Sequence, residues 1–398
     1  MRHLGKKCTG CAACYNGCIS GAIKMKPDSE GFLYPRISKE QCIQCDLCTM
    51  ICPLMGSNLS KLEYPSTKIA FAGKCSDVDL QMSCTSGGVF TAIAVDFIKN
   101  DGIVYGASYM KDFSVKHIRI TDIDEVQKLS GSKYVQSSIN DIYKYVKKDL
   151  DDGLKVLFSG TSCQVAGLRS YLKKDYNFLV CVDMICHGIP SPRIWNWYFG
   201  KLKEKVIDIH KVVHKGKNPG GWDWKKQFML IESSKKEIIL KENIWENSYM
   251  KGFLSDLYLR PYCHECKFKS EDLKRVSDLT LADYWGCEIE EKEFFDSNGI
   301  SLILVNTKKG GKILDNAEKI IIKKTNLKKA LCYNNSAYTS PEKLNVRKRF
   351  FEEFNNIETL EDFKLLVDSC EKEAKKEKRS LIHKVKRKVR HIMYTSRK

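Results

Sequence analysis

Short hydrophobic runs separated by polar segments predict a series of strands and helices from residue 69 onward. The runs at 69–73, 102–106, 155–160 and 178–185 have the length and composition of buried strands. Residues 90–98 carry apolar side chains at helical spacing and follow the first of these strands. Strands that alternate with helical segments are typical of an α/β domain, so we expect a mostly parallel sheet.

The two ends of the chain have different patterns. Residues 1–56 carry dense cysteines and a candidate hairpin near 31–35, and the polar, proline-containing segment 57–68 predicts a linker. A larger domain is expected over 69–345. Helical periodicity over 346–370 predicts packing helices, and 371–398 is a basic amphipathic tail. The expected class is α+β: a ferredoxin-like module, a larger α/β domain and a C-terminal helical tail.

Charge is concentrated in the tail. The whole chain has a net charge of +18, and residues 371–398 contain 12 Lys and Arg against 3 Asp and Glu. Such a helix can lie on an anionic membrane surface or extend into solvent, and both interpretations stay open. We do not expect nucleic acid as a partner, because the tail has no recognised base-reading module.

Composition narrows the class of protein further. Hydrophobic residues make up 43% of the chain, which is enough to form a core. No run approaches eighteen apolar residues, and the N-terminus has no apolar stretch after its basic residues. We therefore expect a cytoplasmic protein, with the tail as a candidate contact to the inner face of the membrane. The 18 cysteines then favour metal ligation over disulfides.

Two cysteine runs of matching spacing dominate the N-terminal 56 residues. The first is C-x2-C-x2-C-x3-C and the second repeats it, followed by Pro53. In this arrangement three cysteines of one run bind one [4Fe–4S] cluster, and the fourth binds the other cluster. The predicted ligands of the first cluster are Cys8, Cys11, Cys14 and Cys52, and those of the second are Cys42, Cys45, Cys48 and Cys18. A pair of zinc sites is the alternative.

The larger domain contains two further candidate sites. Ser86, Gly87 and Gly88 precede a predicted helix, whose free amides favour an anion such as phosphate, although a simple capped loop would have the same pattern. Four cysteines at loop positions could hold a third [4Fe–4S] cluster: Cys163, Cys186, Cys263 and Cys266. The alternatives are a catalytic thiol at Cys163 with Cys186 in the core, or Cys84 or Cys287 as a ligand in place of Cys186.

Six sequence motifs, found in a fixed order, make the resemblance of this chain to one protein family specific. They occur in order at 86–92 (SGGVFTA), 131–137 (GSKYVQS), 160–169 (GTSCQVAGLR), 186–192 (CHGIPSP), 260–268 (RPYCHECKF) and 277–286 (SDLTLADYWG). With these motifs and the fused two-cluster module, residues 1–345 resemble the beta-subunit family of coenzyme F-420 hydrogenase/dehydrogenase.

This resemblance implies an iron–sulfur flavoprotein. The four cysteines of the larger domain become ligands of a third cluster, and FAD is expected beside it. The implied FAD-binding residues are Ser86, Gly87, Gly88, Gly131, Ser132, Lys133, Tyr134, Asp278, Asp283 and Trp285. Lys133 is the candidate catalytic residue because its charge would stabilise reduced flavin; an exposed surface lysine is the alternative.

The expected function is an oxidoreductase that passes electrons between ferredoxin-type clusters and a hydride donor or acceptor, deazaflavin-like or other, through FAD. Its partner would be an electron-transfer protein or a ferredoxin pool. Resemblance alone suggests an anaerobic host and a setting in polysaccharide biosynthesis. Two alternatives remain: a non-catalytic electron-relay subunit of a larger reductase, and a metal-stabilised scaffold.

Overall fold

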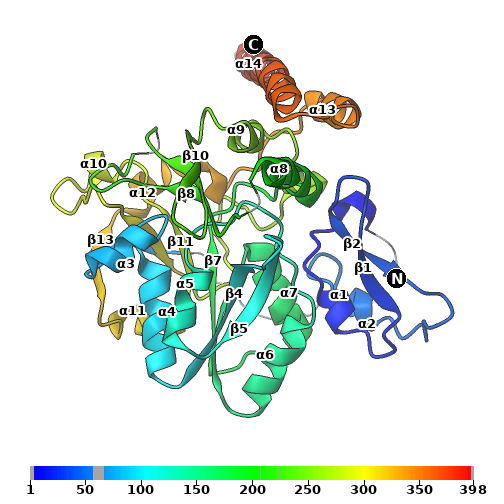
Figure 1. Ribbon diagram of the computed structural model, residues 1–398. Coiled ribbons are helices and arrows are strands. Elements are labelled where there is room, and N and C mark those ends of the chain that lie inside the picture. The colour runs from blue at the N-terminus through cyan, green and yellow to red at the C-terminus, as the bar shows by residue number, and fades with distance from the viewer. Residues whose placement is uncertain (1–3, 57–66, 207, 224, 396–398) are drawn as a thin grey trace.

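The computed structural model describes residues 4–56, 67–206, 208–223 and 225–395, with side chains as far as residue 380. It has three parts: a small N-terminal module, a central sheet with helices on both faces, and an upper layer that ends in a long helix (Figure 1). The predicted linker 57–68 falls almost entirely outside the described residues.

An eight-stranded mixed sheet forms the centre of the molecule. Its spatial order is β13 (Ile320–Thr325), β3 (Ile69–Cys75), β12 (Ser301–Val305), β11 (Leu279–Asp283), β7 (Leu179–Met184), β6 (Lys155–Ser159), β4 (Gly102–Tyr109) and β5 (Val115–Ile120). Strands β11, β7, β6 and β4 are parallel, whereas the pairings outside them are antiparallel. The prediction of a mostly parallel sheet is therefore correct for the four central strands and wrong for the edges. Antiparallel pairs need only a short connection, as at 110–114 between β4 and β5.

Helices cover both faces of this sheet because its central strands are apolar on both sides. Val156 and Phe158 of β6 pack on one face with α6 (Ile142–Asp151) and α7 (Ser162–Leu172). Leu157 points to the other face, which is covered by α4 (Val89–Lys99), α5 (Val126–Leu129) and α11 (Lys308–Asp315). This two-sided burial explains why the runs at 155–160 and 178–185 are almost continuously hydrophobic.

The N-terminal module lies against α6 and α7 (Figure 1). It consists of η1 (Gly5–Lys7), α1 (Ala13–Asn16), the hairpin β1 (Ile23–Pro27) and β2 (Leu33–Ile37), and α2 (Leu47–Met50). Cys11, Ala12 and Ala13 are buried in the same core as α6 and α7. The Asn16 side-chain amide also donates to the Asn140 carbonyl at 2.8 Å. The module is therefore docked on the sheet domain through buried contacts.

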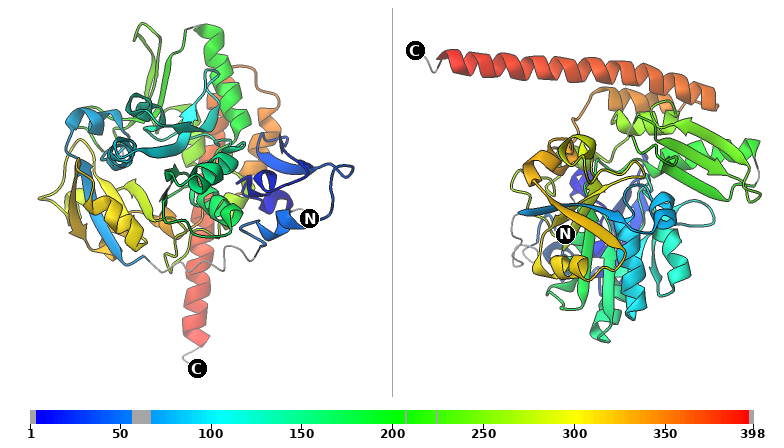
Figure 2. Two further views of the ribbon diagram at one scale, coloured as in Figure 1. Left: turned by 90° about the horizontal axis from the view of Figure 1, so that it is seen from below. Right: turned by 90° about the vertical axis from the view of Figure 1, so that its left-hand side faces the viewer.

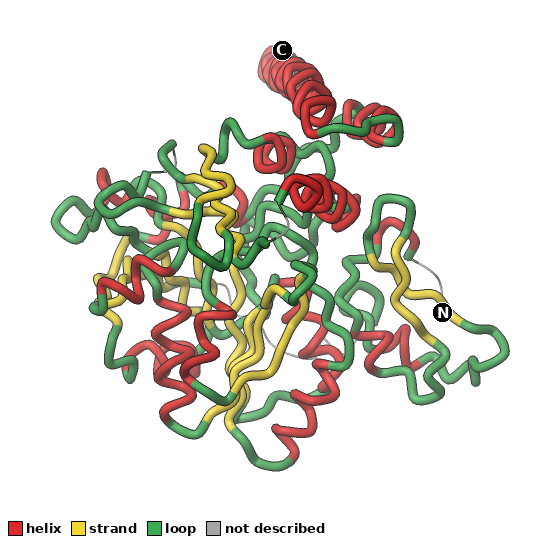
Figure 3. Tube along the Cα trace, in the orientation of Figure 1, coloured by secondary structure: helices red, strands yellow, loops and turns green. Residues whose placement is uncertain are grey.

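The upper layer is built around an aromatic core. It contains α8 (Pro192–Lys205), α9 (Ser248–Leu254), α13 (Val346–Phe354), α14 (Leu360–Thr395) and a three-stranded antiparallel sheet of β8 (Lys211–Gly216), β9 (Phe228–Glu232) and β10 (Ile238–Asn243). Trp195, Tyr249, Phe350 and Phe363 are among its fully buried side chains. Loops rather than regular elements lie between this layer and the sheet (Figure 3). The other short elements are α3 (Val78–Ser83), α10 (Cys287–Glu290), α12 (Leu327–Leu331), η2 (Ile123–Glu125), η3 (Pro261–Glu265) and η4 (Asn335–Ala337).

Helix α14 is continuous across the boundary expected between 346–370 and 371–398. Its first part packs with α13 and α9, and its C-terminal part extends away from the rest of the molecule (Figure 2). The side chains of 381–395, on which the amphipathic prediction depends, lie outside the described part. Within the described residues, no helix combines the length and apolarity needed to span a bilayer.

Candidate functional site

Two loops of the N-terminal module adopt the same backbone conformation. Gly10 and Ala12 have φ values of 76° and 62°, and the matching Gln44 and Asp46 both have φ of 54°. Each pair lies at the same two positions of its cysteine run and leads directly into α1 or α2. Residues other than glycine rarely adopt positive φ. The repeated conformation therefore indicates that both loops are shaped for the same kind of ligand.

The first cysteine set is buried and crowded. Burial, followed by the neighbouring thiols of Cys11, Cys8 and Cys52, raises the pKa of Cys14 well above its usual value. Burial raises the pKa of Cys11 to about 12, with Cys8 and Cys52 adding to the effect. Cys52, from the second run, thus lies with the first three cysteines of the first run. Thiolates crowded in this way repel one another and favour a bound cationic group.

The second cysteine set faces solvent. Cys45 is exposed, and Cys18, Cys42 and Cys48 are half-buried. Three large apolar side chains beside these cysteines are also exposed: Ile19 by 71%, Ile43 by 61% and Met50 by 46%. Surface apolar residues gathered around one site are typical of a contact with another molecule.

The first cysteine set touches α7 at Gly167. A Cβ atom at this glycine would lie 2.9 Å from Cys11 Cβ and 3.0 Å from Cys11 Sγ. We expect Gly167→Ala to destabilise the protein by about 1–3 kcal/mol through overpacking, and to release iron from the module more readily. The control is Gly200→Ala in α8, where a Cβ would meet nothing within 4 Å. That substitution should stabilise its helix by about 0.5–1 kcal/mol. Thermal unfolding and iron release to a chelator measure both, and equal behaviour of the two variants would contradict the close contact.

Four cysteines of the sheet domain converge on one small cavity. Cys163 is the second residue of α7, Cys186 follows β7, and Cys263 and Cys266 lie in and just after η3; all four line this cavity. Burial, followed by Cys266, Cys186 and Cys263, raises the pKa of Cys163 well above its usual value. Cys84 and Cys287 do not line it. The donor set, four half-buried cysteines from three segments, fits a [4Fe–4S] cluster.

In the described part of the chain, no three His, Cys, Asp or Glu side chains are placed to hold a single metal ion. A four-iron cluster requires a different arrangement, because each thiolate binds a separate iron atom.

A cavity of about 790 Å³ adjoins the four-cysteine cavity. It opens at the carboxyl ends of β6, β7 and β11, where parallel sheets usually place their ligands. Its volume is in the range of cofactor sites. Of the residues implied to bind FAD, those that line it are Ser86, Gly88, Gly131, Ser132, Lys133, Tyr134, Asp283 and Trp285. Gly87 does not line it, and its amide donates to Ser301 Oγ at 3.0 Å.

Two lysines, Lys133 (half-buried) and Lys217 (buried), hold the loops at one end of this large cavity. Lys133 Nζ donates to the carbonyls of Ser130 at 3.0 Å and Gly131 at 3.2 Å, and Lys217 Nζ donates to the carbonyl of Ser86. Burial lowers the pKa of Lys133 to about 7 and that of Lys217 to about 8. An anionic ligand in the cavity would restore the positive charge of the Lys133 amine, which lines it. This end of the cavity therefore suits phosphate.

The sequence analysis missed Lys217 and also Lys215. Lys215 forms an ion pair with Asp283, and its Nζ lies 4.7 Å from the centre of the Trp285 ring. Trp285 in turn stacks on Trp222 with ring centres 5.1 Å apart. The only signal in the sequence was the Lys-, Gly- and Trp-rich segment 214–224, which has no regular spacing.

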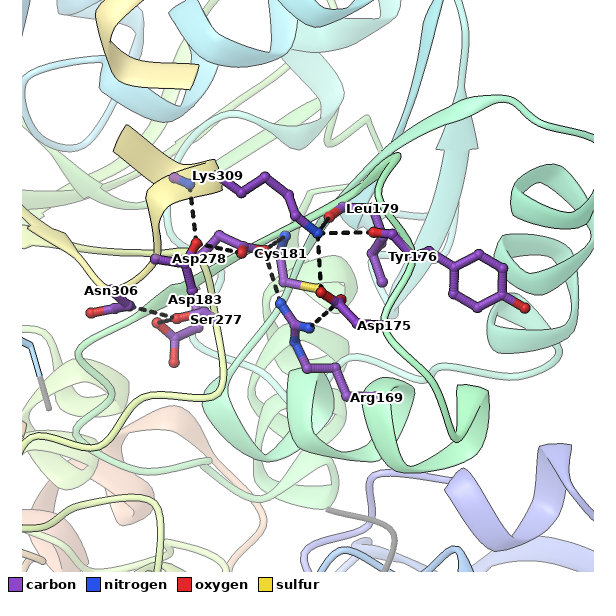
Figure 4. A network of polar contacts seen from close by, with 12 residues as sticks. Arg169, Asp175, Tyr176, Leu179, Cys181, Asp183, Ser277, Asp278, Asn306 and Lys309 are labelled. Atoms are coloured by element: carbon purple, nitrogen blue, oxygen red, sulfur yellow. Dashed lines mark hydrogen bonds and ion pairs between the residues drawn. The ribbon is translucent and has the colours of Figure 1, made fainter. Parts of the chain in front are cut away.

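Asp278, one of the residues predicted to bind FAD, does not line the large cavity. It precedes β11, whereas Asp283, at the opposite end of that strand, lines the large cavity. The Asp278 carboxylate accepts hydrogen bonds from Arg169 Nη2 at 2.9 Å and the Cys181 amide at 2.8 Å (Figure 4). It also accepts one from Thr307 Oγ1 at 2.7 Å. Asp278 therefore joins α7 to the sheet rather than contacting a ligand.

Two family models match separate parts of the chain. Residues 153–329 match the family model of the C terminus of the coenzyme F420 hydrogenase/dehydrogenase beta subunit, and residues 7–55 match the 4Fe-4S dicluster domain. No curated protein matches the chain. Among solved structures, the F420-reducing [NiFe] hydrogenase complex from Methanosarcina barkeri matches with 16% identity and a TM-score of 0.43, covering 79% of this chain and 92% of that chain.

Proposed function

Because the chain combines a 4Fe-4S dicluster domain with a region of the coenzyme F420 hydrogenase/dehydrogenase beta-subunit family, we propose that it is an iron–sulfur flavoprotein that transfers electrons between three [4Fe–4S] clusters and FAD. Cys163, Cys186, Cys263 and Cys266 would hold the third cluster, and the large cavity would hold FAD.

The observation that carries this proposal is the continuity of the sites. Thr9, next to Cys8 of the first cysteine set, lines both the four-cysteine cavity and the large cavity. Cys163 and Cys186 also line both. One path therefore runs from the N-terminal module through the four cysteines to the large cavity. The exposed Cys45 loop, with Ile19 and Ile43 beside it, gives a partner protein access to the outer end of that path.

FAD, when bound, supplies the conversion between a two-electron hydride and single electrons. The residues around the cavity have separate tasks. Lys133 would neutralise the diphosphate with the amide end of α4, and the ion-paired Lys215 and Asp283 would position the ring system near Trp285. The second substrate would be a hydride donor or acceptor, deazaflavin-like or other.

Anaerobic purification with iron, sulfide and flavin analysis tests this function. We expect about twelve irons, about twelve sulfides and one FAD per chain. About eight irons without flavin would reduce the chain to a two-cluster relay and reject the proposal. Zinc in place of iron would indicate a scaffold and would also reject it. Turnover with deazaflavin, nicotinamide and ferredoxin donors would then identify the second substrate.

FAD affinity is expected to fall as pH rises. In the cofactor-free protein, the pKa of Lys133 is about 7, so this amine loses its charge at alkaline pH, whereas a bound diphosphate favours the charged form. The dissociation constant, measured by flavin fluorescence, should rise at least tenfold between about pH 6 and about pH 9.

Lys133→Met should remove much of this pH dependence, and Lys148→Met, at an exposed position of α6, should keep it. The stability of the cofactor-free protein should follow the opposite trend. The unfolded chain, in which the pKa of Lys133 is 10.5, binds more protons above about pH 7, so stability rises with pH there. A pH-independent FAD affinity would contradict this role for Lys133.

A further inference from the structure

A chain of side-chain hydrogen bonds connects the Cys163 sulfur to the wall of the large cavity. Thr161 Oγ1 lies 3.1 Å from Cys163 Sγ and 3.1 Å from Gln164 Oε1. Gln164 Nε2 donates to Ser137 Oγ at 3.0 Å, and Ser137 Oγ lies 2.9 Å from His117 Nδ1. All five side chains line the large cavity. The electron path proposed above, from the N-terminal module through the four cysteines to the large cavity, does not depend on any of these hydrogen bonds.

The direction of each hydrogen bond follows from the donors available. His117 Nε2 faces the Ser159 carbonyl at 2.9 Å, so this nitrogen carries the proton. Burial lowers the pKa of His117 to about 4, and the ring is neutral at pH 7 with Nδ1 as an acceptor. Ser137 must then donate to His117, and Gln164 donates to Ser137. The amide of Gln164 is thereby fixed with Oε1 toward Thr161.

Gln164 Oε1 already has a donor, the backbone amide of Thr161 at 3.0 Å. The Thr161 hydroxyl has one proton and two acceptors within reach, Gln164 Oε1 and Cys163 Sγ. A cysteine bound to iron is a thiolate and cannot donate. When Cys163 is bound to iron, the Thr161 hydroxyl must therefore donate the hydrogen bond to the Cys163 sulfur.

We propose that Thr161 is a positioning residue that donates a hydrogen bond to the Cys163 thiolate and so raises the reduction potential of the third cluster. The inference rests on the function proposed above. Reduction adds negative charge to the cluster and its thiolates, and a hydrogen-bond donor stabilises that charge. Gln164, Ser137 and His117 hold the donor in place from the side that would face the flavin.

The contact differs from the one at Cys263. Cys263 Sγ accepts from the backbone amide of Ile189 at 3.3 Å, which a side-chain substitution does not remove. The Thr161 hydroxyl can be removed without changing the size of the residue, since valine has the same shape.

The test is a redox titration of the full chain, purified anaerobically and followed by electron paramagnetic resonance. The signal of the third cluster is identified as the one missing in Cys186→Ala. Thr161→Val should shift its potential to a lower value, and Thr161→Ser, which keeps the hydroxyl, should stay near the wild type. The two clusters of the N-terminal module serve as internal references and should not move.

An unchanged potential in Thr161→Val, with the third signal present, would overturn the inference and leave the proposed function intact. Absence of a third signal in the wild type would instead reject the proposed function. Thr161 is also the N-cap of α7, so its loss costs about 1 kcal/mol of stability. If Thr161→Val does not fold, Thr161→Ala, which also lacks the hydroxyl, is titrated in its place and must show the same downward shift.

Discussion

Cys186→Ala is expected to lower the iron content from about twelve to about eight atoms per chain. Cys186 lies in the loop after β7, with Cys163, Cys263 and Cys266 around the same cavity. Three remaining thiolates would leave one iron without a protein ligand. Transfer from the N-terminal module to the flavin should fall by at least tenfold, because the middle of the path is lost. Iron analysis and stopped-flow flavin reduction measure the two effects.

The matched control is Cys181→Ala, five residues earlier on β7 itself. Cys181 is fully buried in the core formed with α6 and α7 and does not line the four-cysteine cavity. Its replacement should cost about 1 kcal/mol through the small cavity left behind and should not change the iron content. Equal iron in both variants and in the wild type would show that Cys186 is not a ligand. Cys84, which lines the large cavity, would then be the next candidate.

Arg260→Met is expected to disconnect the N-terminal module. The Arg260 side chain is only 1% exposed, donates to the Cys8 carbonyl at 2.8 Å and the Leu33 carbonyl at 2.9 Å, and lies 4.2 Å from the centre of the Tyr34 ring. The backbone carbonyl of Arg260 accepts a hydrogen bond from the Cys263 amide at 2.8 Å. Arg260 therefore links the first cysteine set to the four-cysteine cavity. Methionine would leave the two module carbonyls without these donors.

We expect Arg260→Met to lower the free energy of unfolding by about 3 kcal/mol and to slow electron transfer to the flavin, while all three clusters remain detectable. Arg193→Met is the control, since Arg193 also donates to a module carbonyl, that of Ser29 at 2.9 Å, but at an exposed position. Its effect on stability should be below about 1 kcal/mol. Flavin reduction at the wild-type rate in Arg260→Met would contradict a bridging role for this arginine.

Local pattern was enough to predict the elements that depend on local contacts. The cysteine spacing predicted the 4Fe-4S dicluster domain that residues 7–55 match, because three of the ligands expected for each cluster come from one short loop. Helix 90–98 and the strands at 155–160 and 178–185 were predicted within one or two residues, since their burial makes them uniformly apolar. The antiparallel edges and the convergence of Cys163, Cys186 and Cys263 depend on pairing between distant segments, on which periodicity carries no information.

The residues of the large cavity could also be predicted only in part from the sequence. Ser86, Lys133 and Asp283 belong to motifs that the family comparison could identify, and they line one cavity. Asp278 lies in the same motif as Asp283, but the two residues are at opposite ends of β11. Lys215 lies in β8 and Lys217 follows that strand, in a segment whose sequence has no regular spacing. Their contacts with Asp283 and with the Ser86 carbonyl form only once the chain is folded.

The contact between Cys11 and Gly167 also constrains how the protein is assembled. Cys11 and Cys14 are each only 8% exposed once the module lies on α7, and the helix leaves no room at Gly167 for even a methyl group. In the docked state the sheet domain therefore shields Cys11 and Cys14 from a protein that would deliver iron. We expect iron to enter the first cysteine set before the module closes onto the sheet domain, so that the maturation of this chain would follow a fixed order.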